Sequence, residues 1–107
     1  MFTRIVECHV KPGKSDEFGN KLRNEVVPIL QKQAGFVDVI GLTSEDDADR
    51  MLAISFWKSK EDAERYEHEH YHRIVDIIKP LVKEDPRVKT FNVETSTSQR
   101  IAARKAA

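Results

Sequence analysis

The chain has 107 residues, with 18 Lys or Arg and 18 Asp or Glu, so its formal net charge is zero. This length predicts a single domain with a thin core, which a partner subunit would stabilise. A neutral chain has no basic field to collect phosphates, which argues against a nucleic-acid partner.

The first third of the chain predicts a strand followed by a helix. Residues 2–10 are rich in β-branched and aromatic side chains, and the turn residues 11–14 close this strand. Ser15 is the expected N-cap of a helix whose apolar residues recur at helical spacing until Gly35. Pro28 is expected to kink the last turns of this helix, because it lacks an N–H and its ring clashes with the preceding turn.

The middle of the chain predicts a hairpin followed by a second helix. Residues 36–43 and 51–57 have strand character, and the acidic segment 44–50 between them is too polar to pack. A capping box then begins at Ser59, and the helix that it starts is expected to run through Val82.

Residues 88–95 predict a fourth strand. The resulting βαββαβ order is that of an α+β, ferredoxin-like fold with an antiparallel four-stranded sheet. The domain is expected to occupy residues 1–95. Residues 96–107 are small, polar and basic, and predict a flexible or partner-contacting tail.

Apolar side chains alternate onto both faces of the predicted sheet. Val6 and Cys8 point one way and Ile5 the other, and Ile54 opposes Ala53 in the third strand. A sheet that is apolar on both faces is covered on both. Because the helices cover one face, we expect a second copy of the chain on the other, in a homodimer that approaches a closed α/β barrel.

The sequence also indicates a compartment. Cys8 is the single cysteine, which is typical of a reducing environment. The N-terminus lacks the apolar stretch of a signal peptide, and the apolar runs are far shorter than the about 20 residues of a membrane span. We therefore expect a cytoplasmic protein with no membrane partner.

Three segments carry a family resemblance, in this order: Val10 to Gly13, Ala34 to Phe36, and Phe56 to Lys60, with a histidine-rich helix after them. Over residues 2–95 the chain resembles the antibiotic biosynthesis monooxygenase (ABM) family. The resemblance implies a dimeric α+β barrel with a pocket between sheet and helices in each subunit. It also implies, for some members, oxidation of aromatic substrates by O₂ without flavin or metal; other members degrade haem, modify small metabolites or have no known activity.

Haem degradation is disfavoured by three residues. Haem-degrading members use an Asn, a Trp and a His at positions that correspond here to Val6, Tyr66 and Asp76. None of the three matches, and a carboxylate is a poor axial haem ligand compared with an imidazole. No cofactor is therefore expected.

The leading hypothesis is a cofactor-independent monooxygenase that acts on a small aromatic or quinone-like metabolite. This chemistry needs a base and donors for the anion that forms. The expected catalytic residues are His72 and His9, whose imidazoles suit the base, and Tyr66, whose hydroxyl could contact a substrate oxygen. The expected substrate-binding residues are Trp57, Tyr71, Asn92 and Arg4.

Two alternatives from other classes stay open. The chain could be a non-catalytic dimeric module, either small-molecule-binding or stress-associated, that shares only the architecture. It could also be a metal-dependent enzyme, because His68 and His72 form an H-E-x-x-H pattern. A solvated histidine cluster is the simpler interpretation of that pattern, so no metal site is expected.

Overall fold

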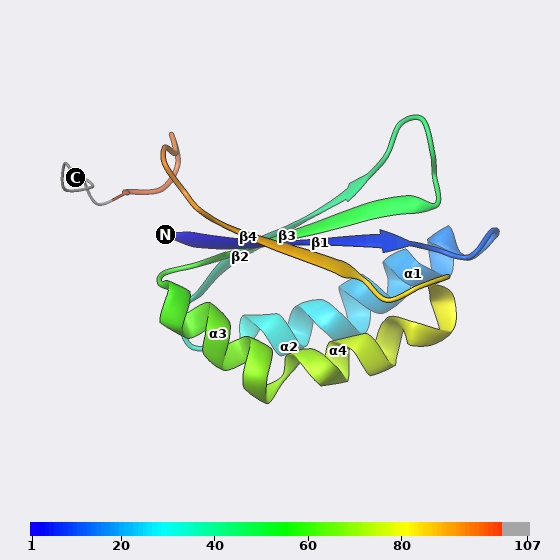
Figure 1. The fold of residues 1–107 in the computed structure, drawn as a ribbon, viewed down its shortest axis with the longest axis horizontal. Helices are drawn as coiled ribbons and strands as arrows, with labels where there is room; N and C mark the ends of the chain where they lie inside the picture. The colour runs from blue at the N-terminus through cyan, green and yellow to red at the C-terminus, as the bar shows by residue number, and fades with distance from the viewer. Residues whose placement is uncertain (102–107) are drawn as a thin grey trace.

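A computed structural model of the chain describes residues 1–101 and has two layers, a sheet and a layer of helices beneath it (Figure 1). The expected antiparallel, ferredoxin-like α+β fold is confirmed, with the strands in the order β2-β3-β1-β4. The elements are β1 (Phe2–His9), α1 (Ser15–Lys21), the π-helical segment η1 (Leu22–Val26), α2 (Val27–Gln31), β2 (Phe36–Thr43), β3 (Arg50–Trp57), α3 (Lys60–Glu69), α4 (Tyr71–Ile78), the 3₁₀ turn η2 (Lys79–Leu81) and β4 (Arg87–Asn92).

The face of the sheet that points away from the helices is called the open face here. Ile5 pairs with Ile54 and Ile54 with Ile40, so three isoleucines form one row across β1, β3 and β2. The side chains of Ile40 and Leu42 are each 43% exposed, and that of Phe91 is 50% exposed. The apolar character expected on both faces is therefore present. The apolar residues of the open face are Ile5, Ile40, Leu42, Leu52, Ile54, Phe56 and Phe91.

The first helical arm differs from the expected helix at both ends. Ser15 is the first helical residue rather than the N-cap, and its hydroxyl donates to the carbonyl of Ala48 at 3.0 Å. The helix does not end at Pro28, and the irregularity lies before that residue: in the π-helical segment η1 the N–H of Val27 donates to the carbonyl of Leu22 five residues back. The arm ends at Gln31, before Gly35.

The second helical arm begins as expected. The N-cap is Ser59, whose hydroxyl oxygen accepts from the backbone N–H of Asp62 at 3.1 Å. The expectation of one continuous helix through Val82 is wrong, because His70 adopts a non-helical φ of −131° and separates α3 from α4. Figure 1 shows the bend between the two helices.

The chain after the fourth strand runs along one end of the sheet. β4 ends at Asn92, three residues earlier than expected, and the N–H of Val93 donates to the carbonyl of Met1 at 2.9 Å. Of the expected tail 96–107, residues 102–107 lie outside the described part of the chain, so its role stays a prediction. No helix within residues 1–101 is long and apolar enough to cross a membrane.

Candidate functional site

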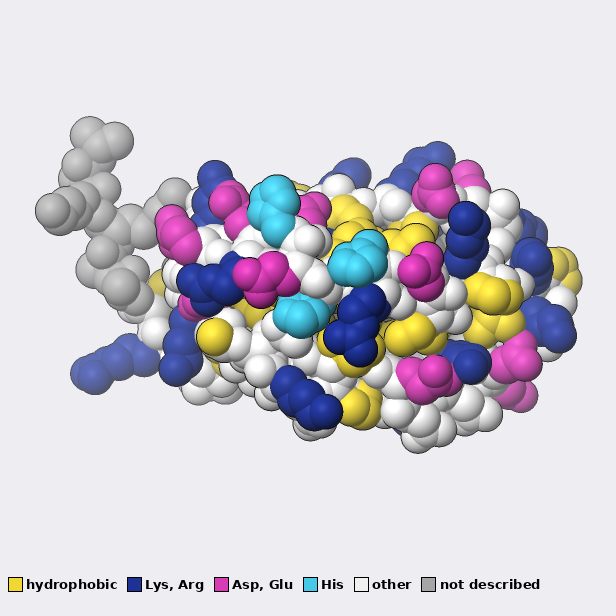
Figure 2. All heavy atoms as spheres, turned by 90° about the horizontal axis from the view of Figure 1, so that it is seen from below, with side chains coloured by type: hydrophobic (Ala, Val, Ile, Leu, Met, Phe, Trp, Pro, Cys, Tyr) yellow, Lys and Arg dark blue, Asp and Glu magenta, His cyan; other side chains and the backbone are white. Residues whose placement is uncertain are grey.

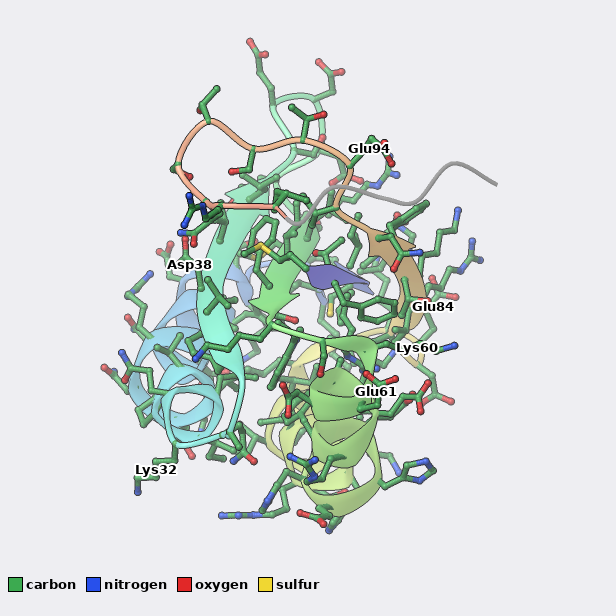
Figure 3. All side chains as sticks on the ribbon, turned by 90° about the vertical axis from the view of Figure 1, so that its left-hand side faces the viewer. Lys32, Asp38, Lys60, Glu61, Glu84 and Glu94 are labelled. Carbon is green, nitrogen blue, oxygen red and sulfur yellow. The ribbon has the colours of Figure 1, made fainter. Side chains whose placement is uncertain are left out.

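A cavity of about 50 Å³ lies between the sheet and the helices. Its wall contains side chains from β1, β2 and β3 above and from both helical arms below. Figure 3 looks along this layer and shows charged side chains such as Lys32 and Asp38 projecting away from it. The lining residues are Arg4, Val6, Cys8, Phe18, Leu22, Val26, Leu30, Val39, Ala53, Ser55, Tyr66, Tyr71, Ile74 and Ile78.

Arg4 is the one ionised side chain among the described residues of this wall, and it is only 2% exposed. The carbon at the centre of its guanidinium lies 4.8 Å from the centre of the Tyr71 ring and 5.6 Å from that of Tyr66, within cation–π range. Its Nη1 lies 3.3 Å from the carboxylate of Glu67. Its Nη2 is buried and has no hydrogen-bond partner within residues 1–101.

The break at His70 brings two tyrosines to the same side of the second arm. At about 100° per residue, Tyr71 would lie about 140° around an unbroken helix from Tyr66. Their ring centres are instead 6.2 Å apart, and both rings line the cavity. Burial raises the pKa of both hydroxyls, although the charge of Arg4 offsets part of this effect. Both hydroxyls therefore stay protonated at neutral pH and can donate a hydrogen bond to a ligand.

Trp57 packs against the cavity-lining residue Tyr66 without lining the cavity itself. The indole is fully buried and stacks on Tyr66 at 4.9 Å between ring centres, with an interplanar angle of 26°. Its N–H donates to the hydroxyl of Ser55 at 2.9 Å, and Phe36 packs edge-on against it. Because the indole is absent from the cavity wall, a bound ligand would meet the Tyr66 ring that the indole holds in place.

The structure places both candidate bases outside the cavity. The alternation along β1 puts His9 with Ile5 on the open side of the sheet, where its Nδ1 lies 2.6 Å from the carboxylate of Glu84. His72 is exposed on α4, two residues and about 200° around the helix from the buried Ile74. Figure 2 shows histidine side chains on the outer surface of the helices, among charged ones. The expectation that these imidazoles reach the pocket is therefore not met here.

The remaining candidates divide in the same way. Arg4, Tyr66 and Tyr71 come together at the cavity, whereas Asn92 is exposed at the end of β4. Cys8 also lines the cavity, and burial raises the pKa of its thiol to about 11, which leaves it a weak nucleophile.

Glu67, the partner of Arg4, did not stand out in the sequence, because one glutamate in a charged helix carries no distinguishing signal. The two helical arms contribute apolar side chains to the same layer: Phe18, Leu22, Val26, Ile74 and Ile78 line the cavity, and Leu81 is buried.

The H-E-x-x-H pattern gains no support as a metal site. Within residues 1–101 there is no group of three or more His, Cys, Asp or Glu side chains that could hold a metal ion. The break at His70 lies between His68 and His72, so the one-turn spacing that the pattern requires is interrupted.

A family model for antibiotic biosynthesis monooxygenases matches residues 1–76. The fold is similar to that of a Nitrosomonas europaea protein described as an antibiotic biosynthesis monooxygenase, at a TM-score of 0.74 and 23% identity, covering 89% of this chain and 100% of that chain. It is also similar to SnoaB, a cofactor-independent oxygenase from Streptomyces nogalater, at a TM-score of 0.75 and 16% identity, covering 92% of this chain and 97% of that chain. At these identities the likeness shows the fold. No curated protein matches the sequence.

Proposed function

Because the chain belongs to the antibiotic biosynthesis monooxygenase family, we propose that it is a cofactor-independent monooxygenase that oxidises a small aromatic or quinone-like metabolite with O₂. The observation that carries this proposal is the cavity wall: two tyrosine rings and aliphatic side chains surround one buried guanidinium, that of Arg4. Such a wall suits a planar ring that becomes an anion during the reaction. The similar fold of SnoaB, described as a cofactor-independent oxygenase, adds support.

This reaction depends more on a pocket that binds the substrate and stabilises its anion than on side chains that react. An anthrone-type substrate loses a proton to give a carbanion or enolate, and this anion transfers an electron to O₂. A C–O bond forms at the ring carbon and the O–O bond breaks, so that one oxygen becomes the quinone carbonyl. The other leaves as water with the two hydrogens that the carbon carried. The protein orients the ring, excludes bulk water and stabilises the anion.

In this proposal Arg4 supplies the positive charge near the substrate anion, and Tyr71 supplies a hydroxyl donor. The Tyr71 oxygen is buried without a hydrogen-bond partner in the described chain. Tyr66, held by Trp57, offers its ring as a platform for the substrate. Because the cavity of about 50 Å³ is smaller than the roughly 300 Å³ of the smallest typical ligand pockets, entry requires the helical arms to move away from the sheet.

We also propose that the protein works as a homodimer whose subunits stack open face to open face. Exposed apolar residues gathered on one face of a small domain favour an interaction site, and a second copy of the chain presents the same apolar residues. Stacking would bury the row formed by Ile5, Ile54 and Ile40 in both subunits.

The oxygenase proposal is tested by O₂ consumption. Chelator-treated protein is incubated with a panel of anthrones and hydroquinones in an oxygen electrode, and the quinone product is followed by absorbance. The expected result is catalysed uptake of one O₂ per quinone formed from an anthrone, strongly reduced by Arg4→Met. Uptake no faster than background with every substrate would overturn the proposal.

A non-catalytic small-molecule-binding module is the second candidate function. It is favoured by the wall of the cavity, in which the described residues include no imidazole or carboxylate that could act as a base. Ligand binding in the cavity without O₂ uptake across the panel would establish this alternative in place of the oxygenase.

A further inference from the structure

We propose that the cavity selects anionic ligands, and that the ligand takes the place of Glu67 on Arg4. The ligand class is a planar apolar molecule that carries one ionised oxygen group, either a carboxylate or a phenolate-type oxygen. This inference deepens the proposed function, and it rests on that proposal in treating the cavity as the substrate site.

The ion pair of Arg4 is incomplete. A guanidinium offers two N–H edges to a carboxylate, and each donor of a buried guanidinium that stays unsatisfied costs free energy. Here Glu67 meets Nη1 at 3.3 Å, while Nη2 is buried without a partner in the described chain. Nη2 is therefore available to a ligand oxygen, and Glu67 at Nη1 does not satisfy it.

Among the described residues of the cavity wall, the two polar groups without a partner can both donate a hydrogen bond. The hydroxyl of Tyr71 is a second buried group without a partner within residues 1–101, and the guanidinium of Arg4 lies over the face of the same ring. The hydroxyl of Ser55 already accepts from Trp57. A ligand with a negatively charged acceptor can accept hydrogen bonds from both groups. A cationic ligand would instead be repelled by Arg4, because the apolar wall offers it no compensating charge.

The position of Glu67 allows its carboxylate to move away from Arg4. Its side chain is 47% exposed although its partner is only 2% exposed, so the carboxylate can turn into solvent while Arg4 cannot. An incoming anion would therefore exchange with Glu67, and the cavity would keep its charge balance. A neutral ligand gives Arg4 no replacement charge, so it would leave the pair in place and gain nothing from it.

This exchange also explains why the cavity wall needs no imidazole among its described residues. A phenol or enol that binds as its anion has already released its proton to solvent, so the described wall needs no side-chain base. The positive charge of Arg4 supplies the stabilisation that makes this release favourable.

The first experiment compares benzoate with its neutral isostere benzamide, by titration calorimetry on the full chain without O₂. Benzoate is expected to bind more tightly. Arg4→Met, which nearly conserves side-chain volume, is expected to weaken benzoate binding roughly tenfold or more and to change benzamide binding little. Glu67→Gln removes the competing carboxylate and is expected to tighten benzoate binding several-fold.

The matched control is Glu64→Gln. Glu64 lies on the same helix and pairs with Lys60 at the surface, at 3.6 Å, so the variant removes the same charge without touching Arg4. Its benzoate affinity is expected to equal that of the wild type. Equal effects of Glu67→Gln and Glu64→Gln would overturn the exchange.

The second experiment uses 4-nitrophenol, whose phenolate absorbs in the visible range. The apparent pKa of the bound phenol is expected to fall by about one unit in the wild type and to stay at the free value in Arg4→Met. Benzoate and 4-nitrophenol together distinguish a carboxylate ligand from a phenolate one. If Arg4→Met does not fold, the wild-type nitrophenol spectrum and the Glu67→Gln titration with benzoate still test the inference.

Two further results would overturn the inference: equal affinity for benzoate and benzamide together with an unshifted nitrophenol spectrum, or no binding of any probe at millimolar concentration. The proposed oxygenase can fail separately. Charge-selective binding without O₂ uptake would refute the oxygenase alone, and O₂ uptake without charge selectivity would refute this inference alone.

Discussion

Replacing Phe91 with serine tests whether a second copy of the chain covers the open face. Phe91 lies on β4 opposite Thr3, and its side chain is 50% exposed in the single chain. The variant should fold, because the ring is not part of the buried core. In a two-fold symmetric dimer the substitution removes the ring from both halves of the interface.

The magnitude follows from the exposed fraction. Complete burial of a phenylalanine side chain contributes about 1.5–3 kcal/mol, so the half that is still exposed represents about 0.8–1.5 kcal/mol in each subunit. Two subunits double this to about 1.5–3 kcal/mol. The dimer dissociation constant of Phe91→Ser is therefore expected to rise roughly 10- to 150-fold.

Sedimentation equilibrium over a range of protein concentrations measures this constant. The matched control is Thr90→Ser, since Thr90 is the neighbouring residue on β4 and alternation places it on the other face. Circular dichroism should show the same secondary structure in the wild type and both variants. A monomeric wild type at micromolar concentration, or equal dissociation constants for the two variants, would refute the reasoning.

Three further predictions concern local structure. Gly35 has a φ of +79° and a Cβ there would collide with the carboxylate of Asp62, so Gly35→Ala should lower the free energy of unfolding by about 2–3 kcal/mol. Gly13→Ala, at a φ of +77° in open space, should cost about 1 kcal/mol, and equal losses in urea unfolding would contradict the collision. Because burial raises the pKa of Cys8 from 9.0 to about 11, its alkylation at pH 8 should be roughly 100-fold slower in the folded than in the unfolded chain, measured by mass spectrometry; equal rates would count against burial. Tyr66→Leu should destabilise the protein by about 1 kcal/mol more than Tyr66→Phe, which keeps the stack on the indole, and similar thermal unfolding of both variants would argue that the stack contributes little.

The alternation of side chains along the strands predicts from the sequence which strand residues face the cavity. Arg4 shares the face of Val6 and Cys8, and that face packs on the helices. The same rule groups His9 with Ile5 on the open face, so the expectation that His9 reaches the pocket conflicts with the alternation itself.

The features of the fold that could not be predicted from the sequence depend on contacts between segments that are far apart in the chain. Residues 68–72 contain no glycine or proline to signal the break at His70, yet that break aligns Tyr66 with Tyr71. The hydroxyl of Ser15 donates to the carbonyl of Ala48 in the loop before β3, so it does not cap the helix as its sequence context predicts. The cytoplasmic location stays a prediction, since nothing in the fold bears on it.

The central claim, that substrate binds between sheet and helices on Arg4, is tested most directly by a crystal structure of the protein grown with benzoate. The expected result is a ring beside Tyr66 and Tyr71, a carboxylate within hydrogen-bond distance of the Arg4 guanidinium, and Glu67 turned toward solvent. A benzoate bound on the open face or on the outer helix surface, with the Arg4 to Glu67 pair intact, would contradict it.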